Sequence, residues 1–143
     1  MKKITEQDFF KACKINDINV VKSFVTNNKE LIDVETKQGW TGLVISCFNQ
    51  NLEITKFLIE NGADLNHSNS KGTTVLMYAK TPVLENQRNT TLLQYLLDKG
   101  ANINARDKFF KTVLDYVIEK ERFVLADWLA SRGAKKSISL SNG

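Results

Sequence analysis

Apolar residues recur along this chain at intervals of three and four, in short blocks separated by polar segments rich in Gly, Asn and Asp. In one block Leu43 and Cys47 precede Ile54, Phe57 and Leu58. This spacing is typical of amphipathic helices, and each block has room for two short ones. Helices this short are marginal in isolation. We therefore expect pairs of helices that are stabilised by packing against neighbouring pairs.

The blocks repeat with matching start and stop signals. Each of three blocks opens on a threonine followed two positions later by leucine: Thr41, Thr74 and Thr112. Each closes on a Gly-Ala pair, which begins at Gly62, Gly100 and Gly133. Threonine caps helix N-termini, and glycine closes helices in the left-handed conformation. The starts are 33 and then 38 positions apart, so we infer a five-residue insertion, 83–87 beside Pro82, in the turn between two helices.

A more divergent block precedes these three. Its helix start, Thr5 to Asp8, resembles a capping box, and Phe9 and Cys13 follow at helical spacing. Terminal repeats are commonly atypical because one side faces water. We predict one repeat domain over 1–135, with repeats at about 4–35, 36–68, 69–106 and 107–135. The polar, Ser-rich segment 136–143 is predicted to be a flexible tail.

The segment from Thr41 to Asn66 resembles an ankyrin repeat in its 33-residue period, its opening Thr-x-Leu and its closing Gly-Ala-Asp-x-Asn. The resemblance covers nearly the whole chain. It implies an all-α ankyrin-repeat solenoid of four helix-turn-helix repeats with β-hairpin-like loops. Gly39 and Gly72 stand at two loop turns, but Phe110 replaces glycine in the last. Because a bulky residue tolerates positive φ poorly, we expect the last loop to have a different shape.

The chain also departs from the family after the opening threonine. Family members usually have Pro directly after this threonine and His two positions after that Pro. In this chain other residues occupy the two positions of each repeat: Gly42 and Val44, Val75 and Met77, Val113 and Asp115. We expect less rigid helix starts for this reason. The hydrogen bonds that this histidine normally makes between loops are expected to be missing.

Composition narrows the class of protein. A chain of 143 residues that is 42% hydrophobic and 25% charged suits a single globular protein. No apolar run approaches the roughly 20 residues that cross a bilayer, and no apolar signal segment follows Met1. We therefore expect a cytoplasmic protein that does not contact a membrane. The net charge is +4, and basic and acidic residues are mixed along the chain. This positive surplus is too small to indicate that the protein binds nucleic acid.

Catalytic and metal-binding patterns are not found. The chain has one histidine, His67, no phosphate-binding glycine loop and no Gly-x-Ser-x-Gly motif. Cys13 and Cys47 take the same repeat position on a first helix, which favours reduced core thiols over redox or metal chemistry. We predict a protein that is not an enzyme and has no cofactor, metal or small-molecule substrate.

The resemblance implies that the protein binds a partner protein on the concave face, which is built from loop tips and first helices. Transferring the family's surface positions gives these candidates for partner binding: Lys37, Trp40, Phe48, Lys71, Thr73, Lys108, Phe109 and Lys111. We interpret the three aromatic residues among basic ones as a binding hot spot with a basic rim, which suits an acidic partner surface. Local packing of the aromatic rings against neighbouring loops is the alternative.

Binding is therefore the predicted activity of this chain. Our leading hypothesis is a small ankyrin-repeat inhibitor, of the kind that an immunity protein exemplifies, which covers a partner's active surface. An adaptor, a scaffold or a self-associating structural protein is the alternative. We expect Trp128, on the outer helix of the last repeat, to cover the exposed end of the stack of repeats, and a second interface there is the alternative. Nucleic-acid binding is disfavoured because acidic residues occur in every repeat and no known reader motif is present.

Overall fold

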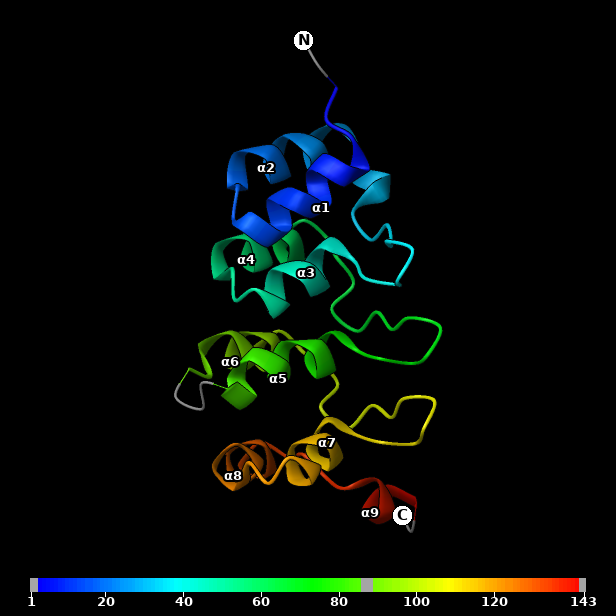
Figure 1. Ribbon diagram of the computed structural model, residues 1–143, viewed down its shortest axis with the longest axis vertical. Coiled ribbons are helices and arrows are strands. Elements are labelled where there is room, and N and C mark those ends of the chain that lie inside the picture. The colour runs from blue at the N-terminus through cyan, green and yellow to red at the C-terminus, as the bar shows by residue number, and fades with distance from the viewer. Residues whose placement is uncertain (1–2, 86–88, 142–143) are drawn as a thin grey trace. The chain divides into compact units, whose positions relative to one another are not determined.

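The computed structural model of this protein describes residues 3–85 and 89–141. Over these ranges the secondary structure consists of helices, and an isolated antiparallel β-bridge joins Ser68 to Thr74 in place of any full strand (Figure 1). The predicted all-α class is confirmed. The predicted start and stop signals are also confirmed, because each opening threonine caps its helix and each closing glycine has positive φ.

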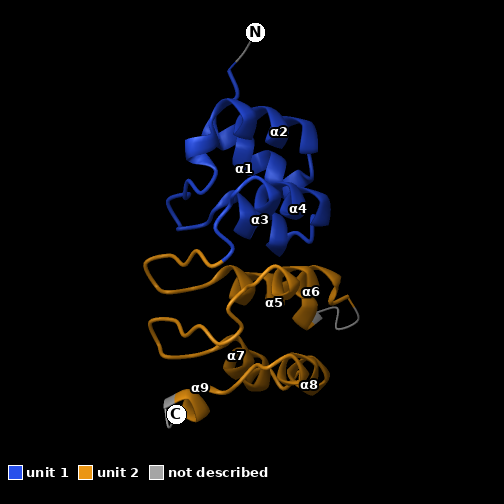
Figure 2. Ribbon diagram, turned by 180° about the vertical axis from the view of Figure 1, so that it is seen from behind, with its two compact units in different colours: residues 1–65 blue, residues 66–143 orange. Residues whose placement is uncertain are grey.

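The chain divides into two compact units, residues 1–65 and residues 66–143 (Figure 2). The described part of unit 1, residues 3–65, contains four α-helices and a 3-10 helix: α1 (Glu6–Ile15), α2 (Ile18–Asn27), η1 (Lys29–Leu31), α3 (Gly42–Phe48) and α4 (Leu52–Glu60). The helices form two antiparallel pairs, α1 with α2 and α3 with α4. These pairs stack through α1 on α3 and α2 on α4.

The core of unit 1 explains one departure from the family. Phe9 of α1 stacks on Phe24 of α2, with ring centroids 4.5 Å apart. A Cβ atom on Gly42 would lie 2.5 Å from the Phe9 ring, so no other residue fits at this helix start without displacing that ring. Thr41 nevertheless caps α3 in the usual way, because its hydroxyl accepts from the N–H of Val44 at 3.2 Å.

Unit 2 contains the remaining helices of the described ranges: α5 (Val75–Glu85), α6 (Thr91–Asp98), α7 (Val113–Glu119), α8 (Phe123–Ser131) and α9 (Ser137–Ser141). The helices α5 and α6 form one pair, α7 and α8 form the next, and α5 packs on α7. The second helix of each pair corresponds to the outer helix of an ankyrin repeat.

The insertion does not begin in the turn where we placed it. Helix α5 has 11 residues, whereas α3 and α7 have 7 each, and it continues through Pro82 to Glu85. The reason is that Val83 extends the buried face formed by Leu76 and Ala79, at the same helical spacing. Residues 86 and 87 of the insertion lie outside the described residues.

The segment after residue 135 also differs from our expectation of a flexible tail. Ser137–Ser141 form the short helix α9, and the N–H of Ser137 donates to both carboxylate oxygens of Asp115 at 3.2 Å. The Thr112 hydroxyl also donates to the carbonyl of Lys135 at 2.8 Å. Asp115 occupies the position of the family's histidine, so in this repeat the hydrogen bonds between loops that we expected to be missing are present.

Asparagine side chains join successive repeats of unit 2. The Asn66 side chain accepts from the N–H of Asn102 at 2.7 Å and donates to the carbonyl of Gly100 at 3.3 Å. One repeat later, the Asn104 side chain accepts from the N–H of Lys135 at 2.8 Å and donates to the carbonyl of Gly133 at 3.0 Å. These side chains satisfy backbone groups that follow each outer helix, and so hold the bases of the loops in place.

Candidate functional site

Three tip loops carry most of the predicted partner-binding residues: residues 36–40 in unit 1, and residues 69–73 and 107–111 in unit 2. In each tip loop the first N–H donates to the fifth carbonyl, over 2.8 Å from Thr36, 3.3 Å from Asn69 and 3.0 Å from Asp107. The fourth N–H donates back to the first carbonyl, over 2.9 Å from Gly39, 2.8 Å from Gly72 and 2.9 Å from Phe110. All three tip loops therefore adopt the same type of hydrogen-bonded turn.

The first side chain of each tip loop reinforces this turn. The Thr36 hydroxyl accepts from the N–H of Trp40 at 3.2 Å. Asn69 Oδ1 accepts two backbone N–H groups of its own loop, at 2.9 and 3.1 Å, and Asp107 Oδ1 also accepts two, at 2.9 and 3.1 Å. Short polar side chains commonly stabilise turns in this way.

Phe110 adopts the backbone conformation of a glycine, and our expectation of a different last loop was wrong. Its φ is +62°, compared with +86° at Gly39 and +75° at Gly72. The hydrogen bonds to Asp107 hold the turn and outweigh the strain, which costs about 1 kcal/mol for a residue with a Cβ atom. The Phe110 side chain is 71% exposed, so packing within the fold does not offset this strain.

The other aromatic candidates also lie at the surface. Phe109 is 66% exposed, while in unit 1 Phe48 at the end of α3 is 47% exposed and Trp40 is 40% exposed. Of the polar candidates, Lys37, Lys71 and Lys108 are exposed, and Thr73 and Lys111 are half-buried. Sequence reasoning missed Phe110 as a surface residue, because only its turn position was considered. The signal was the Phe109-Phe110 pair between Lys108 and Lys111.

The two tip loops of unit 2 contact each other. The N–H of Lys108 donates to the carbonyl of Lys71 at 2.8 Å. Gly72 permits this contact, because a Cβ atom there would lie 3.0 Å from backbone atoms of Asp107 and Lys108. Unit 2 thus presents Lys71, Thr73 and the 107–111 loop on one connected backbone.

The Lys111 side chain is engaged within the protein, whereas we expected it to form part of a basic rim that contacts the partner. Its Nζ lies 2.6 Å from a carboxylate oxygen of Glu119, and this contact is the main cause that raises the pKa of Lys111. The same ammonium lies 5.2 Å from the ring centroid of Tyr116, whose hydroxyl donates to Asp107. Burial and the Asp107 carboxylate raise the pKa of Tyr116. Apart from the repeat spacing, nothing in the sequence predicts that Lys111, Glu119, Tyr116 and Asp107 lie together.

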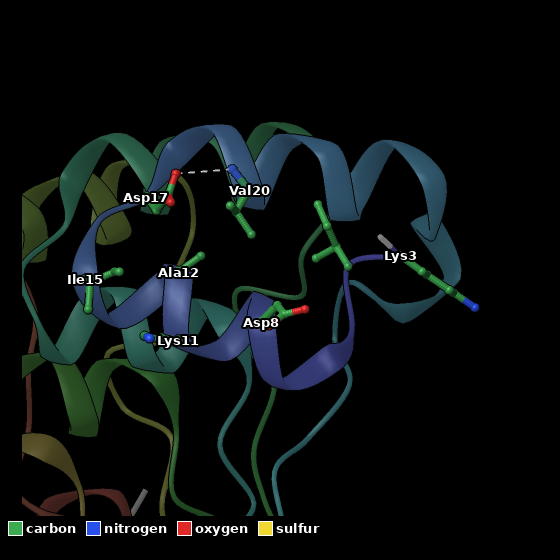
Figure 3. Close-up of a pocket in the computed structure, with 8 residues that line it drawn as sticks. Lys3, Asp8, Lys11, Ala12, Ile15, Asp17 and Val20 are labelled. Carbon is green, nitrogen blue, oxygen red and sulfur yellow. Dashed lines mark hydrogen bonds between the residues drawn. The ribbon is translucent and has the colours of Figure 1, made fainter. Parts of the chain in front are cut away.

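The thiols and the described hollow offer no catalytic chemistry. Cys13 and Cys47 are both 0% exposed, and burial is the main cause that raises the pKa of each to about 12. A hollow of about 320 Å³ lies beside α1 and α2, lined by Ile4, Ala12 and Ile15 among others (Figure 3). Its two carboxylates, Asp8 and Asp17, cap these helices.

Among the described residues, no group of three or more His, Cys, Asp or Glu side chains is placed to hold a metal ion. No helix in the described ranges is long and apolar enough to span a membrane. None of the predicted partner-binding residues lines the hollow beside α1 and α2.

Comparison with known proteins decides the family. A family model described as ankyrin repeats, in three copies, matches residues 9–107. The chain belongs to the ankyrin repeat family. Ankyrin repeats are protein–protein interaction modules, and the family is typically not enzymatic.

Relatives of this ankyrin repeat protein are much longer. It is 30% identical over 113 residues to ankyrin repeat protein L86 of Acanthamoeba polyphaga mimivirus, and 33% identical over 113 residues to protein L371 of the same virus. It is 29% identical over 112 residues to the ankyrin repeat and SAM domain-containing protein 6 of Rattus norvegicus. The matches cover 71%, 79% and 78% of this chain, but 20%, 14% and 12% of those relatives.

Proposed function

We propose that this ankyrin repeat protein binds another protein through surfaces in both units: the 36–40 tip loop with α3 in unit 1, and the 69–73 and 107–111 tip loops with α5 and α7 in unit 2. The observation that carries the proposal is the 107–111 loop. It presents two phenylalanines that are 66% and 71% exposed, one of them with a strained backbone, between two lysines. Neighbouring exposed large apolar side chains mark interaction sites, and a bound partner buries such rings.

The proposed site has one part in each unit. Unit 1 contributes Lys37, Trp40 and Phe48, and unit 2 contributes Lys71, Thr73, Lys108, Phe109 and Lys111, with Phe110 added. Aromatic anchors surrounded by lysines suit a partner that has apolar pockets within an acidic surface. The specific form that we favour is an inhibitor of the immunity type, in which binding covers a functional surface of the partner.

The test is affinity capture from a lysate of the source cell with two separate variants. Trp40→Ala/Phe48→Ala removes the anchors of unit 1, and Phe109→Ala/Phe110→Ala removes those of unit 2. We expect each variant to recover at least about tenfold less of one stoichiometric protein than the wild type does, which corresponds to about 1.4 kcal/mol. Addition of the protein to the purified partner should then abolish the partner's activity, if inhibition is the role.

The matched control is Phe123→Ala/Val124→Ala on α8. These two residues are 59% and 68% exposed, so the control removes a similar apolar area from the outer side of unit 2. Equal loss of partner in the control and in the loop variants would contradict the proposed site.

Self-association is the second candidate, and exposed Phe123 and Val124 favour it. Trp128 on the same helix is half-buried beneath the guanidinium of Arg132, 3.9 Å from its ring centroid, so it is less available for self-association than Phe123 and Val124 are. Sedimentation equilibrium of the wild type and of Phe123→Ala/Val124→Ala tests this candidate. A dimer that the variant loses would support it.

A further inference from the structure

Lys80 is placed where another repeat carries a core residue. It lies six positions after Thr74, the place that Cys47 takes after Thr41. Cys47 is 0% exposed, and Lys80 is half-buried in the first helix of its repeat, α5. Moving a lysine ammonium away from water is unfavourable. The packing of the repeat therefore does not explain why a lysine stands here.

The Lys80 ammonium has a defined position between α5 and α7. Its Nζ donates to the carbonyl of Met77 at 2.8 Å and lies 3.5 Å from the Thr81 hydroxyl. It also lies 5.2 Å from the ring centroid of Tyr116 in α7. Lys111 is at the same distance from that ring, so Tyr116 has two ammonium groups as neighbours.

A third lysine increases the positive charge near Lys80. Lys120 follows the last residue of α7, one helical turn after Tyr116, whose carbonyl accepts its N–H at 3.2 Å, and its side chain is exposed. Burial, and secondarily repulsion by Lys120, lower the pKa of Lys80 to about 8. An anion placed between two like charges is attracted by both, and its presence relieves their repulsion.

Four carboxylates near Lys80 are engaged with other groups in the described part of the chain. Glu119 binds Lys111 at 2.6 Å, Asp107 accepts from Tyr116, Asp115 accepts from Ser137 at 3.2 Å, and Asp98 of α6 accepts from Gln94 at 2.7 Å. Lys99 of the α5–α6 pair lies over its own neighbour, Tyr95, at 5.6 Å. These four carboxylates therefore do not neutralise Lys80 or Lys120.

We propose that Lys80 and Lys120 hold a carboxylate of the partner protein, an Asp or Glu side chain that binds beside Tyr116. This inference rests on the proposed function and names the chemistry of one contact within it. A carboxylate accepts charge-assisted hydrogen bonds from two ammonium groups at once. The Thr81 hydroxyl accepts from Lys80 Nζ at 3.5 Å, and its own proton can be donated to a carboxylate at the same place.

The test is a nuclear magnetic resonance titration of the full chain, labelled at lysine, with a capped pentaglutamate peptide. The capped pentaglutamine peptide is the neutral control ligand. We expect the lysine side-chain signals of Lys80 and Lys120 to shift with pentaglutamate and not with pentaglutamine. Lys80→Met and Lys120→Met should each weaken pentaglutamate binding about fivefold, the loss typical of one hydrogen bond.

The matched control variant is Lys136→Met, which makes the same change of charge at an exposed position. It should bind pentaglutamate as the wild type does. Methionine at position 80 keeps the length of the side chain and removes the half-buried charge, so we expect it to fold with undiminished stability. Urea unfolding checks this point before the titration.

Two outcomes would overturn the carboxylate site: equal affinity of Lys80→Met and Lys136→Met, or equal shifts at all lysines of the wild type. Neither outcome touches the proposed function, which fails separately if Phe109→Ala/Phe110→Ala still captures the protein partner. Conversely, specific shifts at Lys80 and Lys120 would stand even if the tip loops proved unnecessary for capture.

Discussion

Phe110 combines a left-handed backbone with an exposed ring, and glycine would suit that backbone better. We predict that Phe110→Gly raises the free energy of unfolding by about 1 kcal/mol, because glycine removes the strain at φ +62° and little packing is lost. Urea unfolding measures the effect. Phe110→Ala is the control, because alanine keeps a Cβ atom and should not stabilise. A less stable Phe110→Gly would show that the ring packs within the fold.

The two thiols predict a loss of stability in alkali. Burial raises the pKa of Cys13 and Cys47 to about 12, from an ordinary value of 9.0. The folded state therefore holds these protons more strongly than the unfolded state does. Their stabilisation is complete below pH 9 and is lost as the pH rises towards 12, by about 2 kcal/mol for each thiol near pH 10.5.

Urea unfolding at several pH values tests this prediction. Cys13→Ala/Cys47→Ala is the comparison. It should be less stable than the wild type at pH 8, because smaller side chains leave cavities, but its stability should fall less steeply above pH 9. Parallel pH profiles for the two proteins would contradict the prediction.

At the scale of the element, Asp115 joins α7 to α9. Its carboxylate accepts from the N–H of Thr112 at 2.9 Å and from the N–H of Ser137 at 3.2 Å. Burial alone would raise the pKa of Asp115, but these hydrogen bonds together outweigh burial and lower it below its ordinary value of 3.8. The stabilisation is present at neutral pH and is lost as the pH falls through the pKa of the folded state.

We predict that Asp115→Asn lowers the free energy of unfolding by about 1 kcal/mol at pH 7, the usual loss for a helix cap. The difference from the wild type should shrink as the pH falls towards 2. Thermal unfolding at both pH values is the measurement. Asp127→Asn, which changes an exposed carboxylate of α8, should leave stability unchanged at both. A pH-independent loss at position 115 would point to the shape of the side chain instead of its charge.

The sequence predicted the helices well because their signals are local. The threonine caps, the closing glycines and the apolar spacing of each pair depend on nearby residues alone, and all are confirmed. The longer α5 was missed because the five extra residues were assigned to the turn between the helices, whereas the burial of Val83 depends on tertiary packing. The shape of the last tip loop was missed for a similar reason, because the effect of Asp107 on Phe110 outweighs a general steric preference.

The candidate site was predictable only in part. Transfer of family positions found exposed aromatic residues such as Trp40 and Phe109, but it could not show that Lys111 binds Glu119 or that Lys80 lies over Tyr116. Those contacts join residues from different turns or helices, and no periodic pattern in the sequence predicts them. The site therefore depends on the tertiary structure more than the fold does.

At the scale of the whole molecule, a net charge of +4 and several lysines among the candidates predict salt-sensitive binding. We expect the affinity for the partner to fall about tenfold between about 50 and about 500 mM NaCl, mainly through slower association. Surface plasmon resonance with the purified partner measures both rates. Lys37→Gln/Lys71→Gln/Lys108→Gln should bind more weakly and depend less on salt. Affinity that does not change with salt would remove the argument for an acidic partner.

The shared turn of the tip loops separates recognition from folding. Each loop is closed by hydrogen bonds from its own first residue, Thr36, Asn69 or Asp107, and the next two side chains take no part in that closure. Those two side chains can be exchanged while the backbone stays as it is. Natural selection, or a designer, can therefore change the side chains that each loop presents to a partner, one loop at a time, without changing the backbone conformation of the loop.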